Sequence, residues 1–354
     1  MRGAEKRVGI RDVAQAAGLS ITTVSWALNG KGEVAAATRV RVRRVADELG
    51  YRPNEAARAL QSGRSRILGV AVAHRETEPW QQTYLPYYRS VVAGAAIEAV
   101  NHGHAIAAIP VSGVRGLEVP VPFDGLIVVD PVHHDPVLEE CRRRGIRVVA
   151  DGRPIDPGFE DIPVVESDIA TGLGLALDDA AGQGARHFAL LTGPQPDAFT
   201  LDTERHFRDW CRRHGLRSTV RRVRATESPH AAAADLLDRH PEIDAAHALN
   251  ETYGRALLEV AAERQIAVPD RLHVSMMGEP SRVDRQRGVS YLSLDPVSVG
   301  AACVRLLIAT LNDEPAENIL IPCAFVSGRE AAMPLGPAGN GGPAAQVRPS
   351  AARP

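Results

Sequence analysis

Apolar residues recur along the first fifty positions at the spacing of short amphipathic helices. One group follows the i, i+3, i+4, i+7 pattern of a helix with a single buried face, namely Ile10, Val13, Ala14 and Ala17. Gly18 would end this helix, because a left-handed residue at that place is easiest without a Cβ. Ser20 offers a hydroxyl as N-cap of a second helix over residues 21–28. Two helices joined by a short turn that contains Gly predict a helix-turn-helix.

The second predicted helix has two different faces. Val24, Ala27 and Leu28 share one side and can pack inward. The opposite side carries hydrogen-bonding groups and one large ring, at Thr22, Ser25, Trp26 and Asn29. A helix that contacts base edges in the major groove of DNA needs such a face. A third helix, over residues 38–49, repeats the apolar spacing and exposes basic side chains suited to phosphates, at Arg39, Arg41, Arg43 and Arg44.

A short hinge follows the third helix. Pro53 disfavours helix at Arg52, and Asn54 can cap a helix of one to two turns that ends near Leu60. So short a helix is marginal in isolation and forms only when something packs against it. The sequence therefore predicts a switchable element between the head and the rest of the chain.

From Ile67 onward, short apolar runs alternate with amphipathic stretches. Strands are predicted at 67–73, 105–109, 125–129, 147–150, 187–191, 220–223, 245–249 and 274–277. Helices are predicted at 88–101, 136–144, 171–181, 203–214, 229–239, 253–264 and 296–311. Near-continuous apolar strands separated by helices indicate parallel sheets covered on both faces. A break near residues 152–166 divides them into two doubly wound lobes, and a late strand over 319–326 is expected to return to the first lobe.

The connection between Ile109 and Gly125 is unusually short for this pattern. It has only 15 residues and is broken by Pro110, Pro120 and Pro122. We therefore expect a stub or a loop there instead of a full helix, which leaves one edge of the first lobe thinly covered.

Charge and cysteine content narrow the class of protein. Residues 1–66 hold 13 Lys+Arg and 6 Asp+Glu, a net charge of +7, whereas the remainder holds 28 and 37, a net charge of −9. A basic N-terminal segment joined to an acidic remainder indicates that only the N-terminal segment binds nucleic acid. The four cysteines are widely spaced and are expected to be reduced, buried small side chains: Cys141, Cys211, Cys303 and Cys323. There is no export signal and no apolar run of membrane-spanning length, so a cytoplasmic location is expected.

The head and hinge resemble those of the lac repressor family (LacI/GalR). The motifs that carry the likeness are Ile10-Arg11-Asp12-Val13-Ala14, Thr23-Val24-Ser25, Leu28-Asn29-Gly30, Leu49-Gly50-Tyr51-Arg52-Pro53-Asn54 and Ala57-Arg58-Ala59-Leu60. They follow one another almost without gaps over about sixty residues. A three-helix bundle without DNA contact is the plainer alternative, but it would explain neither the arginines nor the hinge.

The resemblance implies a DNA contact for each matching position. Ile21, Thr22 and Trp26 match positions of the recognition helix that meet base edges. Positions that touch the DNA backbone in the family are matched by Ser20, Thr23, Ser25, Asn29, Tyr51 and Asn54. Leu60 matches the hinge leucine that enters the minor groove as an apolar wedge and kinks the duplex, with Ala57 beside it.

Two positions of the head depart from the family pattern. Trp26 stands where many members carry Arg or another polar residue. Its ring could contact a thymine methyl, or it could merely pack on the helix surface. Ala35 stands where relatives usually have a Ser cap, so the third helix is expected to begin less firmly.

The order of elements after the hinge resembles the core of the same family, a periplasmic-binding-protein-like type I fold. The supporting segments are Gly125-Leu126-Ile127-Val128, Arg144-Gly145-Ile146-Arg147-Val148-Val149, Ala189-Leu190-Leu191-Thr192-Gly193, Val268-Pro269 before Met276-Met277-Gly278, and Arg329-Glu330. We therefore expect an all-α helix-turn-helix head (1–52) and a hinge helix with linker (53–66), joined to a two-lobed α/β core of doubly wound parallel sheets (67–335). The first lobe takes about 67–165 and part of 295–335, the second takes about 166–294, and the Gly-, Pro- and Ala-rich tail (336–354) is expected to be disordered.

Candidate effector-binding residues lie in the loops after strands, because ligands of open α/β sheets bind outside the carboxyl ends of strands. Asp151 and Asn250 each follow a predicted strand and match pocket positions of the family. Glu251 replaces the Asp that usually follows that Asn. Trp80 belongs to an aromatic cluster with Tyr84, Tyr87 and Tyr88, which could stack on a ligand or instead pack the lobe or a dimer face.

Two further pocket positions have changed relative to the family. Leu201 falls where many members have an Arg, and Pro280 falls where they have an Asp. Arg205 and Glu279 lie nearby and could substitute for them. Arg205, Glu251 and Glu279 could equally form an ion network in a cleft that binds no ligand.

These observations predict a homodimeric, sequence-specific transcription regulator that acts as a repressor. Its affinity for a pseudo-palindromic operator in double-stranded DNA would be changed by a small-molecule effector, a sugar or another metabolite, in the cleft of the core. It would be cytoplasmic, associated with the bacterial nucleoid when bound to DNA, with no cofactor, metal or membrane partner. The alternative is a ligand-independent DNA-binding regulator with a degenerate cleft.

An enzyme is not expected from this sequence. It contains no Gly-x-Ser-x-Gly, Walker or His-Glu-x-x-His motif. The pairs His133-His134 and Asp178-Asp179 have no partner at metal-binding or catalytic spacing along the sequence, and both pairs are predicted to be surface residues. The missing export signal and the attached head likewise disfavour a transport binding protein.

Overall fold

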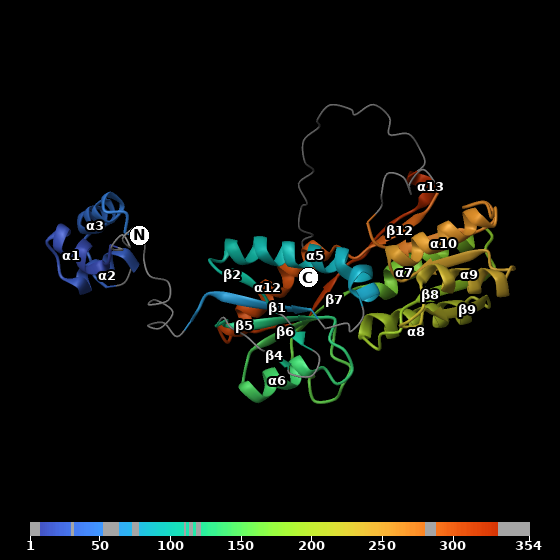
Figure 1. The fold of residues 1–354 in the computed structure, drawn as a ribbon, viewed down its shortest axis with the longest axis horizontal. Helices are drawn as coiled ribbons and strands as arrows, with labels where there is room; N and C mark the ends of the chain where they lie inside the picture. Colours follow the sequence, from blue (N-terminus) through green and yellow to red (C-terminus); the bar gives the residue numbers. More distant parts are fainter. Residues whose placement is uncertain are drawn as a thin grey trace, which may run out of the picture. The chain divides into compact units, whose positions relative to one another are not determined.

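The structure is a computed structural model that describes residues 8–29, 32–51, 64–72, 78–109, 111–112, 116–117, 122–279 and 288–331. The chain divides into two compact units, a helical head and an α/β core (Figure 1). The predicted hinge helix, with Asn54, Ala57 and Leu60, and the predicted disordered tail lie outside the described residues.

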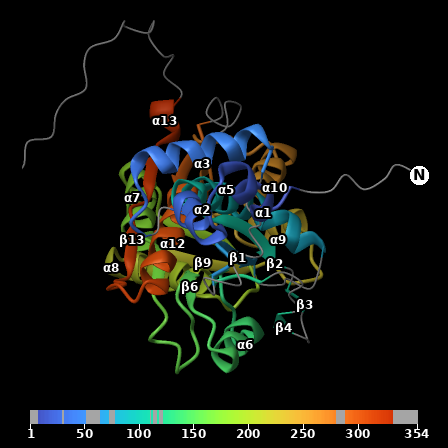
Figure 2. The same ribbon diagram turned by 90° about the vertical axis from the view of Figure 1, so that its left-hand side faces the viewer.

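The head consists of three helices (Figure 2), which pack around a small apolar core. They are α1 (Ile10–Ala17), α2 (Ile21–Asn29) and α3 (Ala36–Glu48), as the apolar spacing predicts. Gly18 ends α1 in the left-handed conformation, with φ +62°. The backbone N–H of Thr23 donates to Oγ of Ser20 at 3.1 Å, which confirms the predicted cap of α2. Ala35 precedes α3 without a side-chain cap, also as expected.

The first lobe of the core is built on a sheet with the strand order β13-β7-β6-β5-β1-β2. Its strands are β1 (Ile67–Val72), β2 (Ala105–Ile109), β5 (Gly125–Val129), β6 (Val148–Asp151), β7 (Val164–Ser167) and β13 (Ile319–Ile321). The pairs from β1 through β5, β6 and β7 to β13 are all parallel. Figure 1 shows α5 (Glu78–Asn101) and α12 (Pro296–Leu311) over one face of this sheet and α6 (Pro136–Arg144) on the other.

The second lobe has a sheet with the order β14-β12-β11-β10-β8-β9. Its strands are β8 (His187–Thr192), β9 (Arg217–Arg222), β10 (Ala245–Ala248), β11 (His273–Met277), β12 (Ser290–Ser293) and β14 (Ala324–Val326). Only β14, among these pairs, joins its neighbour in the antiparallel direction. In this lobe α7 (Ile169–Gly182) packs beside α8 (Ala198–Arg213), and α9 (Pro229–Arg239) packs beside α10 (Glu251–Glu263). A last short helix, α13 (Gly328–Ala331), follows β14.

Three parts of the predicted core are wrong in detail. Strands β7 and β12 have no predicted counterpart, and β7 lies at the end of the segment that was expected to be a break. The late strand predicted over 319–326 is two strands, because β13 joins the first sheet whereas β14 joins the second. The chain therefore crosses between the lobes three times, after β7, after β12 and between β13 and β14.

Two helices begin five or more residues earlier than predicted. Helix α5 begins at Glu78, ten residues before the predicted start, and contains Pro86. Helix α8 begins at Ala198, because the side chain of Asp197 accepts a hydrogen bond from the backbone of Thr200 and so caps it. This early start places the first turns of α8 beside the lobe boundary.

The connection between β2 and β5 contains a small hairpin. Strands β3 (Val111–Ser112) and β4 (Gly116–Leu117) pair in the antiparallel direction, so the described residues of this segment agree with the predicted stub. Neighbouring β2 is the edge strand of its sheet and is only partly buried. No helix within the described ranges combines the length and apolar character needed to cross a membrane.

Candidate DNA-binding head and effector cleft

Helix α2 divides its residues between the head core and solvent. Val24 and Ala27 are fully buried, and Leu28 packs partly against them. Ile21 and Trp26 are each 46% exposed although both are large and apolar. An exposed apolar pair on a short helix is a candidate contact surface, since these side chains gain from leaving water when a partner covers them.

The polar side chains of this face are held by near neighbours. The hydroxyls of Ser20 and Thr23 lie 2.8 Å apart, and Nδ2 of Asn29 donates to Oγ of Ser25 at 3.3 Å. Thr22 is exposed, whereas Tyr51 is half-buried against the core of the head. Because these polar pairs are local and exposed, they can exchange for DNA contacts at small cost to folding.

Trp26 lies against the backbone of Gly32. A Cβ at Gly32 would come within 2.7 Å of Cε3 of the Trp26 ring, and Gly32 has φ +66°. One part of the ring therefore packs within the head while the rest is exposed. Both interpretations of Trp26, packing and base contact, have a physical basis in this arrangement.

The arginines of α3 differ in their exposure and in their contacts. Arg41 and Arg43 are exposed. Nη1 of Arg44 lies 3.3 Å from the carboxylate of Glu48. The prediction of full exposure is wrong for Arg39, which is half-buried and donates to the carbonyl oxygen of Gly32 at 3.3 Å.

In the core, a cavity of about 570 Å³ opens where the carboxyl ends of strands from both sheets meet. It is lined by every candidate effector residue whose side chain is described, namely Asp151, Arg205, Asn250, Glu251 and Glu279. The side chains of Trp80 and Tyr84 and the position of Pro280 lie outside the described part. Leu201 is exposed on α8 and is not among the lining residues, so it contributes nothing to the cleft.

The first-lobe wall of the cleft is built from two tyrosine–carboxylate pairs. The hydroxyl of Tyr87 lies 3.2 and 3.1 Å from the two oxygens of Asp151, and the hydroxyl of Tyr88 lies 3.1 Å from Oδ2 of Asp130. Burial, and next the negative charge of Asp130, raise the pKa of Asp151 well above its usual range. Burial and the same two carboxylates raise the pKa of Tyr87. This wall therefore holds acceptor oxygens away from bulk water.

An ion pair joins the two lobes across the cleft. Nη2 of Arg153, which follows β6, lies 2.8 Å from both carboxylate oxygens of Asp202 on α8. Nε of Arg153 lies 3.7 Å from Glu166, whose pKa is raised mainly by burial. Arg205 also pairs with Asp202, at 2.9 Å. Movement of the lobes must lengthen or break the pair between Arg153 and Asp202.

The second-lobe wall contains an unsatisfied hydrogen-bond donor. Oδ1 of Asn250 accepts from the backbone of Tyr253 at 3.0 Å and caps α10. Its Nδ2 is buried and has no hydrogen-bond partner within the described part of the chain. Buried donors are nearly always paired in folded proteins. An acceptor oxygen of a bound molecule would satisfy this one.

The side chain of Glu251 lies against the backbone of Gly278 and Glu279. The carboxylate of Glu251 accepts from the backbone N–H of Glu279 at 3.0 Å. Gly278, which precedes Glu279, has φ +145°, and a Cβ there would lie 2.3 Å from Cγ of Glu251. The predicted ion network of Arg205 with these two glutamates is wrong, because Arg205 pairs with Asp202 instead.

Four cleft residues were missed at the sequence level: Asp130, Arg153, Glu166 and Asp202. Asp130 follows β5 as Asp151 ends β6, so the rule that selected Asp151 could have found it. Glu166 lies on the unpredicted strand β7, and Asp202 on the part of α8 that was not expected to be helical. Tyr87 and Tyr88 belonged to the predicted aromatic cluster, and both interact with carboxylates.

The residue pairs predicted to lie at the surface do so, although Asp179 is half-buried, and each pair has side-chain partners. Asp178 accepts from Nε1 of Trp210 at 2.9 Å, and Asp179 accepts from Nε2 of Gln183 at 2.9 Å. His133 and His134 are exposed, and both contact the carboxylate of Asp156, which is distant from them in the sequence. The cysteines are free thiols as predicted, with Cys141, Cys211 and Cys303 buried and Cys323 half-buried.

A helix-turn-helix head that precedes a two-lobed core with an interlobe cleft defines a class of DNA-binding transcription regulators. The chain belongs to the lacI family of bacterial regulatory proteins. The family profile described as "Bacterial regulatory proteins, lacI family" matches residues 9–54, and the profile "Periplasmic binding protein-like domain" matches residues 177–329.

Known relatives extend this likeness over most of the chain. The HTH-type transcriptional regulator PtxS of Pseudomonas plecoglossicida is 30% identical over 242 residues, which are 65% of this chain and 67% of that protein. A solved complex of the transcriptional regulator CelR with cellobiose is 24% identical, with a TM-score of 0.65 over 91% of this chain and 99% of CelR. The lac repressor dimer bound to operator and the anti-inducer ONPF is 20% identical, with a TM-score of 0.74 over 91% and 98%. The predicted family, fold and regulatory function are confirmed.

Proposed function

We propose that the chain is a homodimeric repressor whose operator affinity is controlled by a neutral, polyhydroxylated small molecule bound in the cleft. The observation that carries the effector part is the unpaired Nδ2 of Asn250, which lines the same cavity as the buried carboxylate of Asp151. A hydroxyl group both donates and accepts hydrogen bonds. One ligand with several hydroxyls can therefore accept from Asn250 and donate to Asp151.

The charges of the cleft support this ligand class. Carboxylates outnumber guanidinium groups along its lining, which contains Asp130, Asp151, Glu166, Asp168, Asp202, Glu251 and Glu279 against Arg153 and Arg205. An excess of acceptors favours ligands that present hydroxyls and disfavours phosphorylated ones, because like charges in a partly buried site repel. CelR was solved in complex with cellobiose, so this disaccharide is a suitable first probe.

The DNA-binding part of the proposal rests on the outward face of α2. Ile21, Thr22 and Trp26 would contact base edges. The backbone would be held by Ser20, Thr23, Ser25, Asn29, Tyr51 and Asn54, while Ala57 and Leu60 would enter the minor groove at the centre of the operator. Two such heads in a dimer require a pseudo-palindromic site. The lac repressor structure is that of a dimer on its operator, and operator binding would place this chain at the nucleoid.

The dimer proposal is supported by an apolar surface of the first lobe. Ile97 and Val100 are both well exposed on α5, which contacts the edge strand β2. Two neighbouring exposed aliphatic side chains on one helix are typical of a surface that a second copy covers. Sedimentation of the full chain should give twice the monomer mass.

Coupling between the cleft and the head would act through the first lobe. The backbone N–H groups of Ser65 and Arg66 donate to the carboxylate of Asp124, the residue before β5, and so hold the chain where it leaves the hinge. A ligand that separates Arg153 from Asp202 would shift the lobes and favour one state of the hinge over the other. The shift can be no larger than the difference in the ligand's affinity for the two states.

A second candidate function is a ligand-independent DNA-binding regulator. It is favoured by the extent to which cleft residues already bind one another, as Arg153 does Asp202 and Tyr87 does Asp151. In that case the cleft would be a structural joint between lobes.

Thermal unfolding of the full chain with cellobiose and a panel of neutral saccharides distinguishes these two functions. We expect at least one saccharide to raise Tm, to change binding of the operator selected from a random DNA pool, and to lose its effect in N250S. Serine retains a capping oxygen for α10 but has no amide donor. S228A, which removes the cap of the distant helix α9, should lower stability and leave the ligand-induced shift intact. If no neutral saccharide shifts Tm, the ligand-independent function is the better one.

A further inference from the structure

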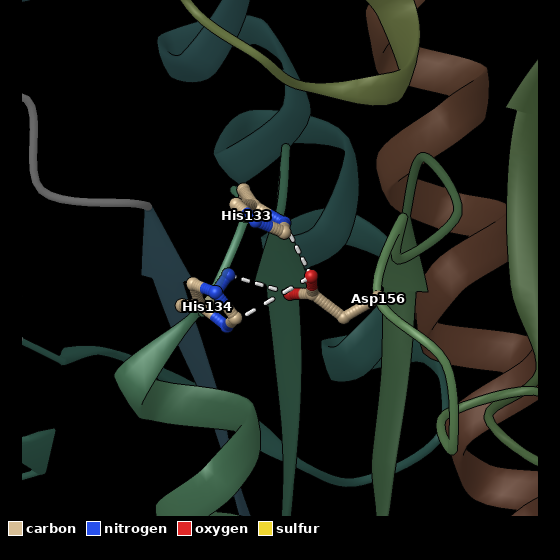
Figure 3. Close-up of side chains that lie close together, drawn as sticks. All are labelled: His133, His134 and Asp156. Atoms are coloured by element: carbon tan, nitrogen blue, oxygen red, sulfur yellow. Dashed lines mark hydrogen bonds and ion pairs between the residues drawn. The ribbon is translucent and has the colours of Figure 1, made fainter.

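Two histidines and one aspartate converge at the rim of the first lobe. His133 and His134 lie in the loop after β5, and Asp156 lies in the loop after β6, so the parallel pairing of these strands brings them together (Figure 3). The ligand atoms that the three residues offer lie within 4.8 Å of one another. Sequence spacing could not reveal this group, since Asp156 follows His134 by 22 residues.

The two oxygens of Asp156 have different roles. Oδ2 accepts a hydrogen bond from the backbone N–H of His134 at 2.5 Å. Oδ1 is buried, forms an ion pair with Nδ1 of His133 and lies 4.0 Å from Nδ1 of His134. The Asp156 side chain is only 10% exposed. A buried carboxylate oxygen is costly to leave without a partner. Either an imidazole that carries a proton on Nδ1 or a metal ion shared with the imidazoles would satisfy this one.

Neighbouring contacts hold this arrangement in place. The buried carboxylate of Asp135 accepts from the backbone N–H groups of Val132 and Val137, at 3.1 and 2.8 Å, and so fixes both ends of the histidine pair. The rings of His133 and His134 lie with centroids 3.9 Å apart. Oriented ligands supported by outer contacts are a general feature of metal sites.

We propose that His133, His134 and Asp156 form a binding site for a divalent transition-metal ion, with Zn²⁺ as the first candidate. Two imidazole nitrogens and one carboxylate oxygen are a donor set that zinc accepts in tetrahedral geometry, with a fourth position open to water or another ligand. Atoms bound to one tetrahedral zinc lie about 3.3 Å apart. Oδ1 of Asp156 and Nδ1 of His134 are 4.0 Å apart, so small side-chain rotations close the site. Mg²⁺, which prefers oxygen ligands, does not suit it.

The site joins two loops that also shape the cleft. The loop that carries Asp156 begins near Arg153, which pairs with Asp202 of the other lobe, and the loop with the histidines begins at Asp130. A bound ion would restrain both loops at once.

Calorimetric titration of the chelator-treated full chain with zinc chloride at pH 7.5 tests the site. We expect one ion per chain, no comparable binding of Mg²⁺, and an affinity at least tenfold lower in H133A and in H134A. Both histidines are exposed, so these variants should retain the wild-type melting transition. H230A is the matched control, because exposed His230 faces the single carboxylate of Glu263 at 2.9 Å without a second imidazole, and it should bind zinc like the wild type.

Two further readouts decide between a metal site and an ion pair. Co²⁺ should give the visible absorption of a four-coordinate complex in the wild type and lose it in H134A. Zinc affinity should fall on acidification, because protons compete with the metal ion for the imidazole nitrogens. Equal zinc affinity in the wild type, H133A and H134A would overturn the proposal and leave Asp156 as a partner of protonated imidazole only.

Discussion

The outward face of α2 in the head and the wall of the cleft place their polar groups in opposite surroundings. On α2 the polar side chains interact with residues three or four positions away, as Ser20 does with Thr23 and Asn29 with Ser25. In the cleft, Asp151 is 4% exposed, and its tyrosine partner is 64 positions away in the sequence. We therefore expect substitutions on α2 to change function without changing stability, and substitutions in the cleft to change both.

The largest expected effect comes from the close contact between α5 and α12 that supports the first-lobe wall. A Cβ at Gly300 would lie 2.0 Å from the backbone oxygen of Val91, and one at Gly94 would lie 2.0 Å from that of Val297. The backbone of the neighbouring helix can move away only at a large cost in free energy. G300A should therefore destabilise the core by about 3 kcal/mol or more. G174A, in α7 with nothing within 4 Å of the added Cβ, should be neutral or stabilising. Chemical unfolding of the two variants measures the difference, and equal stabilities would contradict this packing argument.

Acidification should destabilise the core through His247. Burial lowers the pKa of this histidine to about 3, so the folded state binds fewer protons than the unfolded state below about pH 6.5. Stability then falls with decreasing pH by up to about 1.4 kcal/mol per pH unit, or about 2 kcal/mol between pH 6.5 and 5. Denaturant unfolding across this range should show a shallower fall in H247N than in the wild type.

Asp151 provides the control for that pH experiment, because its contribution to stability changes with pH in the opposite direction to that of His247. Its raised pKa means that the folded state binds its proton more tightly, so this carboxyl adds stability as pH falls toward its unfolded value near 3.9. D151N removes that gain and should make the acid-induced loss steeper than in the wild type. Identical pH dependence in all three proteins would show that neither buried group controls it.

Helices and strands that are determined by residues close together in the chain were predictable from the sequence. The three helices of the head follow from apolar spacing, the left-handed Gly18 and the Ser20 cap, and α6 and α9 match their predicted bounds. The strands that were missed are short and lie at or near the sheet edges. Strands β7 (VVES) and β12 (SYLS) have four residues each, and half of the residues in each strand are polar. Neither length nor apolar character therefore marks them in the sequence.

Only those cleft residues that lie in a single loop after a predicted strand could be identified from the sequence. The rule that polar residues after strands face the ligand selected Asp151, Asn250 and Glu251, all of which line the cavity. The pairing of Arg153 with Asp202 depends on how the two lobes meet. The group of His133, His134 and Asp156 depends on strand order. Such contacts arise from topology, and no local pattern in the sequence contains them.

In the head, two substitutions should separate base contact from phosphate contact. W26A should reduce discrimination by on the order of tenfold at one or two base pairs of each half-site, with little change at the others. R43A removes an exposed charge from α3, so it should weaken all sequences alike and lower the salt dependence of log K by about 0.9. Titration of single-base operator variants at two salt concentrations measures both. Uniform weakening in W26A would assign Trp26 to packing against Gly32 instead.

The smallest expected effect tests whether the head can be stabilised without changing its contacts. Ala35 precedes α3 in an extended conformation (φ −56°, ψ 144°) and offers no side-chain acceptor, so A35S should supply one to the first turn and gain about 1 kcal/mol. Amide exchange of α3 in the full chain should slow about fivefold, while S20A, which removes the cap of α2, should speed exchange of α2 by a similar factor. Operator preference should not change in A35S, because Ala35 lies outside the outward face of α2. A changed preference would mean that stability and DNA contact are linked in the head as they are in the cleft, and the contrast between the two regions would fail.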